Sequence, residues 1–173
     1  GGNQQRIVVG LQGKGWGPGD FKAGGRDRNP AGPNVKGFPE FLKTVPKEKP
    51  FCFWFGHRDP HRAYEKGQGV KAGLKLDDVI VPPYLPDTPE VRSDLLDYYF
   101  AVQRFDRDLG QVLDALEASG RASNTLVIVT GDNGMPFPPC KANVYDSGSR
   151  QPQVKNEYHG VSRMRPRSAR TLT

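Results

Sequence analysis

Residues 125–141 read TLVIVTGDNGMPFPPCK, an apolar run that gives way to an acid, an amide, a glycine, three prolines and a lysine. The run TLVIV, bounded by polar residues, is typical of a buried β-strand. Asp132 and Asn133 follow that strand directly. A tight turn alone would explain them, since Asn-Gly is a common turn dipeptide. A turn needs neither the three prolines nor the lysine, so the segment raises the question of a binding site.

A long helix is predicted just upstream, over residues 89–119. Apolar residues recur there at steps of three and four, which draws one apolar stripe: Val91, Leu95, Tyr98, Val102, Phe105, Leu109, Val112 and Leu116. Thr88 suits the N-cap, Pro89 the first helical position and Gly120 the C-terminal cap. A coiled coil shows similar spacing, but a helix lying on a sheet is favoured because the strand follows within a few residues.

The run FCFWFG at residues 51–56 predicts a second strand, buried on both faces. Strand, long helix and strand in that order indicate a parallel crossover unit. Ligands of such sheets gather at the carboxyl ends of the strands. Both HRDPHRAY at 57–64 and TGDNGMPFPPCK at 130–141 follow a strand. That shared position is the first reason to expect chemistry.

The rest of the chain supports an α/β class with long loops. A short strand is predicted within residues 5–12 and a short helix over about 36–45. The segment GKGWGPGD at 13–20 must be a loop, because glycine and proline dominate it. Residues 65–88 are polar and rich in Gly and Pro, which predicts a loop, and a loop of that length is usually functional or disordered.

Composition sets outer limits on the protein. The 173 residues amount to one domain or a piece of a larger one, and 35% are hydrophobic, with 21 Gly and 16 Pro. No apolar stretch is long enough to span a membrane. The first residues do not resemble a signal peptide, so either the protein is not exported or its true start lies upstream. Cys52 and Cys140 have no zinc-site spacing, and Cys52 is predicted to be a small buried hydrophobic residue.

The net charge of +6 comes mostly from one end of the chain. Residues 151–173 contain five lysines and arginines against Glu157 alone, a net of +4, which leaves +2 for residues 1–150. A body so close to neutral is not the electrostatic footprint of a nucleic-acid-binding protein.

Three groups of polar residues are candidates for a site. Asp132 and Asn133 offer the oxygen ligands that calcium prefers. Lys141 close by favours an anionic ester as ligand, because a cation and an ammonium group together neutralise charge on its oxygens.

His61 can act as a proton donor or bind an anion, although a histidine also ties down loops, and His57 ranks below it because it lies nearer the strand. Lys14 lies on a glycine-rich loop that is not a Walker P-loop, and a solvated lysine is the plain alternative.

Four blocks in this order resemble the sulfatase family of the alkaline-phosphatase-like superfamily, in its heparan N-sulfatase-like branch. They are GKGWGPGD, PFCFWFGHRDPHRAY, the VPPYLPDTPEVRSDLLDYYFAVQRFDRDLGQVLDALEASG region and NTLVIVTGDNGMPFPPCKANVYDSG. The resemblance covers about residues 7–148, and its last block is the most specific. It implies a partial alkaline-phosphatase/sulfatase-like fold, in which a mainly parallel sheet is flanked by helices and is incomplete.

The resemblance also implies an activity and roles for the candidate residues. Members of the family hydrolyse sulfate esters or sulfamates with a formylglycine made from cysteine or serine, and calcium holds the sulfate oxygens. By motif, Asp132 and Asn133 would be two calcium ligands, Lys141 would contact the sulfate group, His61 would face the leaving group and Lys14 would approach the nucleophile. The expected partner is a sulfated carbohydrate, with no nucleic acid. The expected compartment is extracellular, periplasmic or lysosomal.

The sequence departs from the family pattern at both ends. The formylglycine motif C/S-x-P/A-x-R and the early pair of aspartates are absent, and Trp16 stands where the family often has a histidine. Residues 1–150 are therefore interpreted as the central part of a catalytic domain. Residues 151–173 are interpreted as a basic tail without strand pattern, out of frame or, alternatively, binding polyanions. The chain alone is expected to be inactive and to bind calcium weakly. A non-catalytic remnant that binds sulfated glycans and a related phosphoesterase are the alternatives.

Overall fold

A computed structural model describes residues 6–17, 19–149 and 153–157 of the chain. Helices and strands alternate along it, as an α/β class requires. In chain order they are β1 (Val8–Gly13), α1 (Phe38–Thr44), β2 (Phe51–Gly56), α2 (Gln68–Lys71), a 3-10 turn (Leu76–Asp78), α3 (Pro89–Ala118), a 3-10 turn (Ala122–Asn124), β3 (Leu126–Thr130), α4 (Asp146–Ser149) and β4 (Gln153–Glu157).

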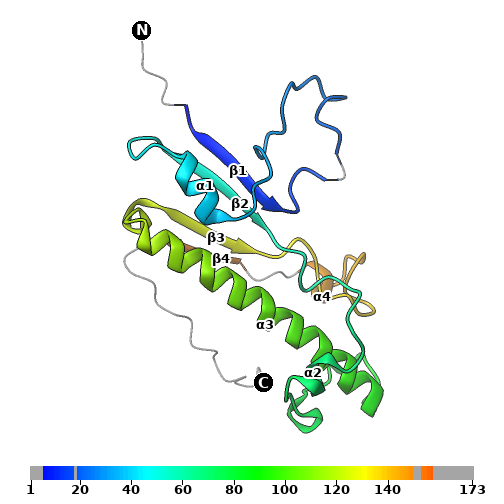
Figure 1. The fold of residues 1–173 in the computed structure, drawn as a ribbon. Coiled ribbons are helices and arrows are strands. Elements are labelled where there is room, and N and C mark those ends of the chain that lie inside the picture. The colour runs from blue at the N-terminus through cyan, green and yellow to red at the C-terminus, as the bar shows by residue number, and fades with distance from the viewer. Residues whose placement is uncertain (1–5, 18, 150–152, 158–173) are drawn as a thin grey trace.

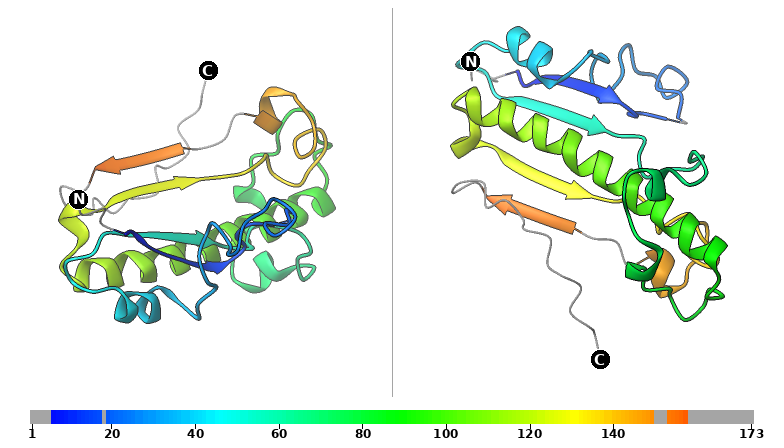
Figure 2. Two further views of the ribbon diagram at one scale, coloured as in Figure 1. Left: turned by 90° about the horizontal axis from the view of Figure 1, so that it is seen from above. Right: turned by 60° about the horizontal axis from the view of Figure 1, so that its bottom comes forward.

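The strands form two pairs that share one long helix. β1 and β2 are parallel, in a register that runs from Val8 opposite Phe51 to Gly13 opposite Gly56. β3 and β4 are antiparallel. β2 and β3 point the same way, as the crossover prediction requires (Figures 1 and 2), and α3 passes between them in the right-hand view of Figure 2. Among the described residues, however, no backbone hydrogen bonds pair β2 with β3. The predicted parallel sheet flanked by helices is thus confirmed. Its facing edges, on β2 and β3, are not paired with each other.

The long helix α3 begins and ends where the capping residues predict. The Thr88 hydroxyl accepts a hydrogen bond from the Val91 N–H at 3.3 Å, and Pro89 occupies the first helical position. Gly120 has a φ of 70°, the left-handed conformation that closes a helix C-terminus. The buried side chains extend beyond the predicted stripe, because Leu96, Asp97 and Ala101 are buried too. The helix therefore packs against neighbours on more than one side.

An aromatic core lies between α1, α3 and one face of the strands. Phe38 and Phe41 of α1 are 3% and 1% exposed, and their rings lie 4.8 and 5.0 Å from the ring of Phe53. The Phe41 ring occupies the space that a side chain at Gly10 would need, so glycine there lets α1 approach the sheet closely. The other contributors from the strands and helices are Val8, Phe51, Val112, Leu116 and Val127.

The opposite face of the same strands is open. Trp54, Leu126 and Ile128 are 56%, 52% and 57% exposed, and Cys52 is exposed. Three predictions were therefore wrong: β2 is not buried on both faces, β3 is buried on one face only, and Cys52 is not a buried hydrophobic residue. The physical reason is that side chains alternate across a strand, and only one face meets α1 and α3.

The long segment between β2 and α3 is ordered by a second apolar cluster, which we call the loop cluster. Its buried members are Val79, Leu95, Leu96 and Phe137. Residues from the 65–88 segment and Met135 pack around them. The 65–88 segment therefore contains α2 and a 3-10 turn and packs against the N-terminal half of α3.

The C-terminal strand β4 corrects a further prediction. Residues 151–173 were expected to lack a strand, yet Gln153–Glu157 pairs with β3 from Thr130 opposite Gln153 to Leu126 opposite Glu157. The unpaired backbone groups of a strand edge can recruit a neighbouring segment of weak intrinsic preference. The remainder of the predicted tail lies outside the described residues. Within the described part of the chain, no helix is both long and apolar enough to cross a membrane.

Candidate active site

The loop that carries Lys14 is held against the carboxyl end of β2. The Lys14 N–H donates to the Gly56 carbonyl at 2.7 Å. A Cβ at position 56 would overlap the backbone of Lys14, so only glycine permits this approach. Lys14 itself is exposed. The structure thus places its backbone beside the residue that precedes His57.

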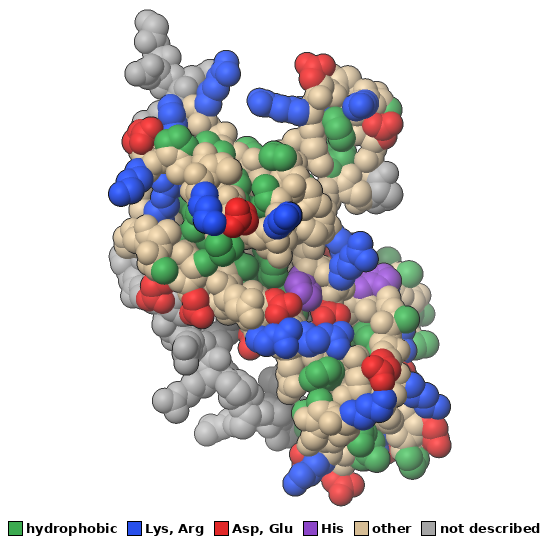
Figure 3. Space-filling view, in the orientation of Figure 1, with side chains coloured by type: hydrophobic (Ala, Val, Ile, Leu, Met, Phe, Trp, Pro, Cys, Tyr) green, Lys and Arg blue, Asp and Glu red, His purple; other side chains and the backbone are tan. Residues whose placement is uncertain are grey.

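The two histidines after β2 have different surroundings, and histidine side chains are visible on the face of the molecule drawn in Figure 3. His57 Nδ1 accepts the Asp59 N–H at 2.9 Å, and its Nε2 lies 3.0 Å from Asp108 Oδ2. An accepting Nδ1 means that Nε2 carries the proton and donates it to the carboxylate. Both ring nitrogens of His57 are therefore used inside the fold.

His61 is exposed, and its Nδ1 contacts the Arg62 carbonyl. A carbonyl can only accept, so Nδ1 carries a proton whether the ring is neutral or charged. No other described group bonds to the ring, so Nε2 has no partner among the described residues. His61 is the histidine of this loop with a nitrogen available to a ligand.

Asp132 and Asn133 begin the loop after β3 as predicted. Asp132 is exposed and Asn133 is half-buried, and neither side chain bonds to another described group. The chemistry of these oxygens fits calcium. Gly134 lets the loop pass close to α4: its N–H donates to the Gly148 carbonyl at 3.1 Å, and a Cβ there would overlap the backbone of Ser147. In the described part of the chain no group of three or more His, Cys, Asp or Glu side chains is placed to hold a metal. The pair therefore fits as part of a calcium site and falls short of a whole one.

Lys141 lies at the end of a compact turn. Its N–H donates to the Met135 carbonyl at 3.2 Å, and the preceding Cys140 N–H donates to Phe137 at 2.7 Å. Cys140 is fully buried, with its Sγ 3.3 Å from the Tyr84 hydroxyl. Burial, followed by this contact, raises the pKa of Tyr84 to about 12. The backbone around Lys141 is therefore fixed from several sides, while its ammonium group bonds to no described residue.

Arg62 joins the two loops, and the sequence did not single it out. Its Nε donates to the Pro136 carbonyl at 3.0 Å, and its two terminal nitrogens lie 2.9 and 2.5 Å from the carboxylate of Asp94. Its guanidinium also lies 4.6 Å from the ring centre of Phe137. The loop after β2 and the loop after β3 are thus brought together at one edge of the strands, through a side chain anchored on α3.

A second pair of charges holds the loop after β2 to the same helix. Arg104 binds both carboxylate oxygens of Asp59, at 2.8 and 2.9 Å, and donates to Gln68 at 2.7 Å. The buried Asp97 accepts from the N–H groups of Gly67 and Gly69, both at 2.8 Å. A sequence signal for these partners existed: the polar residues Asp94, Asp97, Arg104 and Asp108 follow helical spacing beside the apolar stripe.

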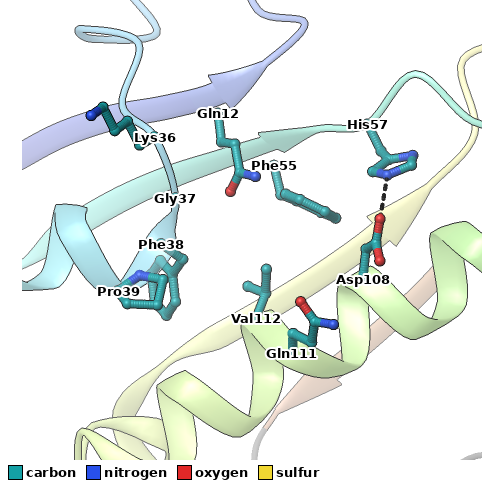
Figure 4. A pocket seen from close by; sticks show the side chains of 10 residues that line it. All are labelled: Gln12, Lys36, Gly37, Phe38, Pro39, Phe55, His57, Asp108, Gln111 and Val112. Atoms are coloured by element: carbon teal, nitrogen blue, oxygen red, sulfur yellow. Dashed lines mark hydrogen bonds and ion pairs between the residues drawn. The ribbon is translucent and has the colours of Figure 1, made fainter.

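A pocket of about 310 Å³ opens on the helix side of the strands (Figure 4). The His57–Asp108 pair lies in its wall. Partial burial raises the pKa of Asp108, but hydrogen bonds from His57 and Arg107 outweigh burial and leave that pKa below its ordinary value. None of the predicted site residues lines this pocket: its walls are Gln12, Lys36, Gly37, Phe38, Pro39, Phe55, His57, Asp108, Gln111 and Val112. The predicted site residues therefore lie outside this pocket.

Comparison with known proteins identifies the family to which this chain is similar. The family model described as Sulfatase matches residues 33–161, about three quarters of the chain. The chain is 35% identical over 134 residues to the human N-sulphoglucosamine sulphohydrolase, covering 65% of this chain and 26% of that protein. It is 39% identical over 74 residues to the ulvan-active sulfatase of Formosa agariphila, covering 43% of this chain and 12% of that protein. It is 33% identical over 95 residues to the endo-4-O-sulfatase of Bacteroides thetaiotaomicron, covering 50% and 18%. The chain thus spans about a quarter or less of the relatives it matches.

Proposed function

Because the chain belongs to the sulfatase family, we propose that it forms part of a calcium-dependent hydrolase of sulfate esters or sulfamates on sulfated sugars. The observation that carries this proposal is the meeting of three polar loops at one edge of the strands. The Lys14 loop bonds to Gly56 at the end of β2, and Arg62 bonds the loop after β2 to the loop after β3. We propose a sugar substrate because the names of two relatives specify sulphoglucosamine and ulvan.

Each candidate residue has a role that its surroundings permit. Asp132 and Asn133 would hold calcium together with oxygens from outside the described residues, and calcium would neutralise charge on the sulfate oxygens. Lys141 would pair its ammonium group with the same anionic group. His61 would deliver a proton to the leaving group from Nε2, because its Nδ1 is held by the Arg62 carbonyl. Lys14 would approach the nucleophile from the loop beside Gly56.

The nucleophile is the part of the reaction that these 173 residues do not supply. No C/S-x-P/A-x-R motif is present in the sequence. The chain alone is therefore expected to turn over no aryl sulfate. Chelator-sensitive turnover by the purified chain would contradict this expectation. The compartment proposed for the whole protein is extracellular, periplasmic or lysosomal.

The test is a titration of the isotopically labelled chain, followed residue by residue by NMR. Calcium should shift the amides of residues 131–134 with a dissociation constant of about 10⁻⁴ M or weaker, since two protein ligands are too few for a tight site. Inorganic sulfate should shift Lys141 and His61.

Asp132→Asn should remove the calcium response. Asp27→Asn serves as the matched control, because Asp27 is exposed and has no side-chain partner among the described residues. Calcium shifts that map elsewhere, or a submicromolar affinity, would overturn the assignment of these ligands.

A further inference from the structure

The Arg62 side chain makes an ion pair, a further hydrogen bond and two contacts with aromatic rings within the fold. Its planar guanidinium grips Asp94 with two nitrogens, donates from Nε to the Pro136 carbonyl, and lies over the rings of Phe137 and Tyr64 at 4.6 and 5.1 Å. Its own carbonyl meets His61 Nδ1. A single residue therefore contacts α3, the loop after β3 and the candidate proton donor.

These contacts are better suited to positioning than to overall stability. The side chains of Arg62 and Asp94 are 39% and 40% exposed, and ion pairs of that exposure contribute little to the free energy of unfolding. Their geometry is nevertheless specific, because a two-pronged pair fixes the plane of the guanidinium. With that plane fixed, the directions of Nε and of the ring face are fixed as well.

The loop after β3 can transmit this constraint to Lys141. Met135 accepts hydrogen bonds from the N–H groups of Phe137 and Lys141, at 2.8 and 3.2 Å, and Phe137 accepts from Cys140. Pro136 and Phe137, the two residues that Arg62 touches, therefore lie inside the turn that ends on Lys141. By fixing these two residues, Arg62 can fix the conformation of the whole turn.

We propose that Arg62 is a positioning residue, which sets the lysine-bearing turn 135–141 at a fixed place relative to His61. The proposal rests on the proposed function for the identity of the site, since Lys141 and His61 are its candidate anion-binding and proton-donating groups. Asp94 is the anchor: it orients Arg62 from the rigid helix α3. Lysine cannot replace Arg62, because an ammonium is a point charge without the planar fork.

The test compares amide hydrogen exchange in the 173-residue chain and its variants. Arg62→Gln, Arg62→Lys and Asp94→Asn should each speed exchange of the Cys140 and Lys141 amides by about tenfold, equivalent to about 1.4 kcal/mol of local opening. Exchange in β1 and β2 should not change.

Arg58→Gln is the matched control, because Arg58 is an exposed arginine in the same loop whose side chain has no partner among the described residues. It should leave all of these rates unchanged. Combining Arg62→Gln with Asp94→Asn should add little to either change alone, because the two residues act as one unit.

Three outcomes would overturn the proposal. They are unchanged exchange at Cys140 and Lys141, an equal rise throughout the strands, and full rescue by Arg62→Lys. The sulfate titration separates this result from the proposed function. Faster exchange of the turn in a chain that binds neither sulfate nor calcium would sink the proposed function and leave the positioning role intact. Unchanged exchange at Cys140 and Lys141 in an Arg62→Gln chain whose parent binds sulfate at Lys141 would do the reverse.

Discussion

The two faces of β2 and β3 have similar apolar residues and opposite surroundings. In β2, Phe51 and Phe53 pack with Phe38 and Phe41 of α1, whereas Trp54 is 56% exposed. In β3, Val127 joins the same core, while Ile128 is 57% exposed. We call these the closed face and the open face.

An apolar strand sequence therefore does not by itself show that both faces are buried. Each face is buried only where another element of this chain packs against it. Contiguous exposed apolar patches of folded proteins usually mark contact surfaces. The open face and the unpaired edges of β2 and β3 are therefore expected to make the chain prone to aggregation.

The comparison is tested most strongly by removing one aromatic ring from each face. Phe41→Ala should lower the free energy of unfolding by about 3–5 kcal/mol, because it leaves a cavity in the closed core. Trp54→Ser on the open face should change it by no more than about 0.5 kcal/mol. Urea unfolding followed by far-ultraviolet circular dichroism measures both. Similar losses for the two variants would erase the distinction between the faces.

The end of β2 offers a test of close packing that involves neither face. Gly56→Ala places a methyl group against the Lys14 backbone and should cost about 1–3 kcal/mol. It should also shift the amide resonances of the Lys14 loop. Gly17→Ala is the control, since nothing lies within 4 Å of a Cβ there, and it should be neutral or slightly stabilising. If Gly56→Ala is equally harmless, then the loop is not held against β2.

Titration to alkaline pH tests whether the loops at the strand ends are shielded from water, as the closed face is. Burial raises the pKa of Tyr64 to about 12, although the charge of Arg62 opposes the rise, and the Tyr64 hydroxyl donates to the Pro60 carbonyl at 2.7 Å. The folded state keeps this proton more tightly than the unfolded state, whose tyrosines ionise near pH 10. The contribution of protonated Tyr64 to the free energy of unfolding is therefore complete below about pH 10, and it should be lost as pH rises to about 12.

Ultraviolet absorbance titration of the chain and of Tyr64→Phe isolates this group. Tyr64→Phe should lose a component near pH 12 and show a weaker fall in stability over that window. A component that titrates near pH 10 instead would mean that Tyr64 is solvated.

The smallest expected effect on stability comes from charging the open face. Ile128→Lys should change the free energy of unfolding by about 0.5 kcal/mol or less and should reduce self-association, because it interrupts an exposed apolar strand. Light scattering against concentration measures the association. Val127→Lys is the matched variant on the closed face and should unfold the chain. An equally damaging Ile128→Lys would show that the open face is covered in solution.

Local patterns in the sequence were enough to predict α3 and the strands β1, β2 and β3, and to place the candidate polar residues in loops after strands. The spacing of apolar residues predicted α3, and Thr88, Pro89 and Gly120 set its ends, because capping depends on neighbours along the chain. The same reasoning located both loops after strands and chose His61 above His57. The calcium and sulfate roles of Asp132, Asn133, Lys14 and Lys141 remain predictions.

The sequence by itself therefore determined the order of β1, α1, β2, α3 and β3, the family and which loops carry the polar groups. Only the tertiary structure decided which strand face is covered, that β4 pairs with β3, and that Arg62 joins Asp94 to Pro136. The physical reason is range. A helix period or a cap is set by residues a few positions apart, whereas Arg62 and Pro136 are separated by 74 positions. Their contact exists because α3 and the strands first fold into place.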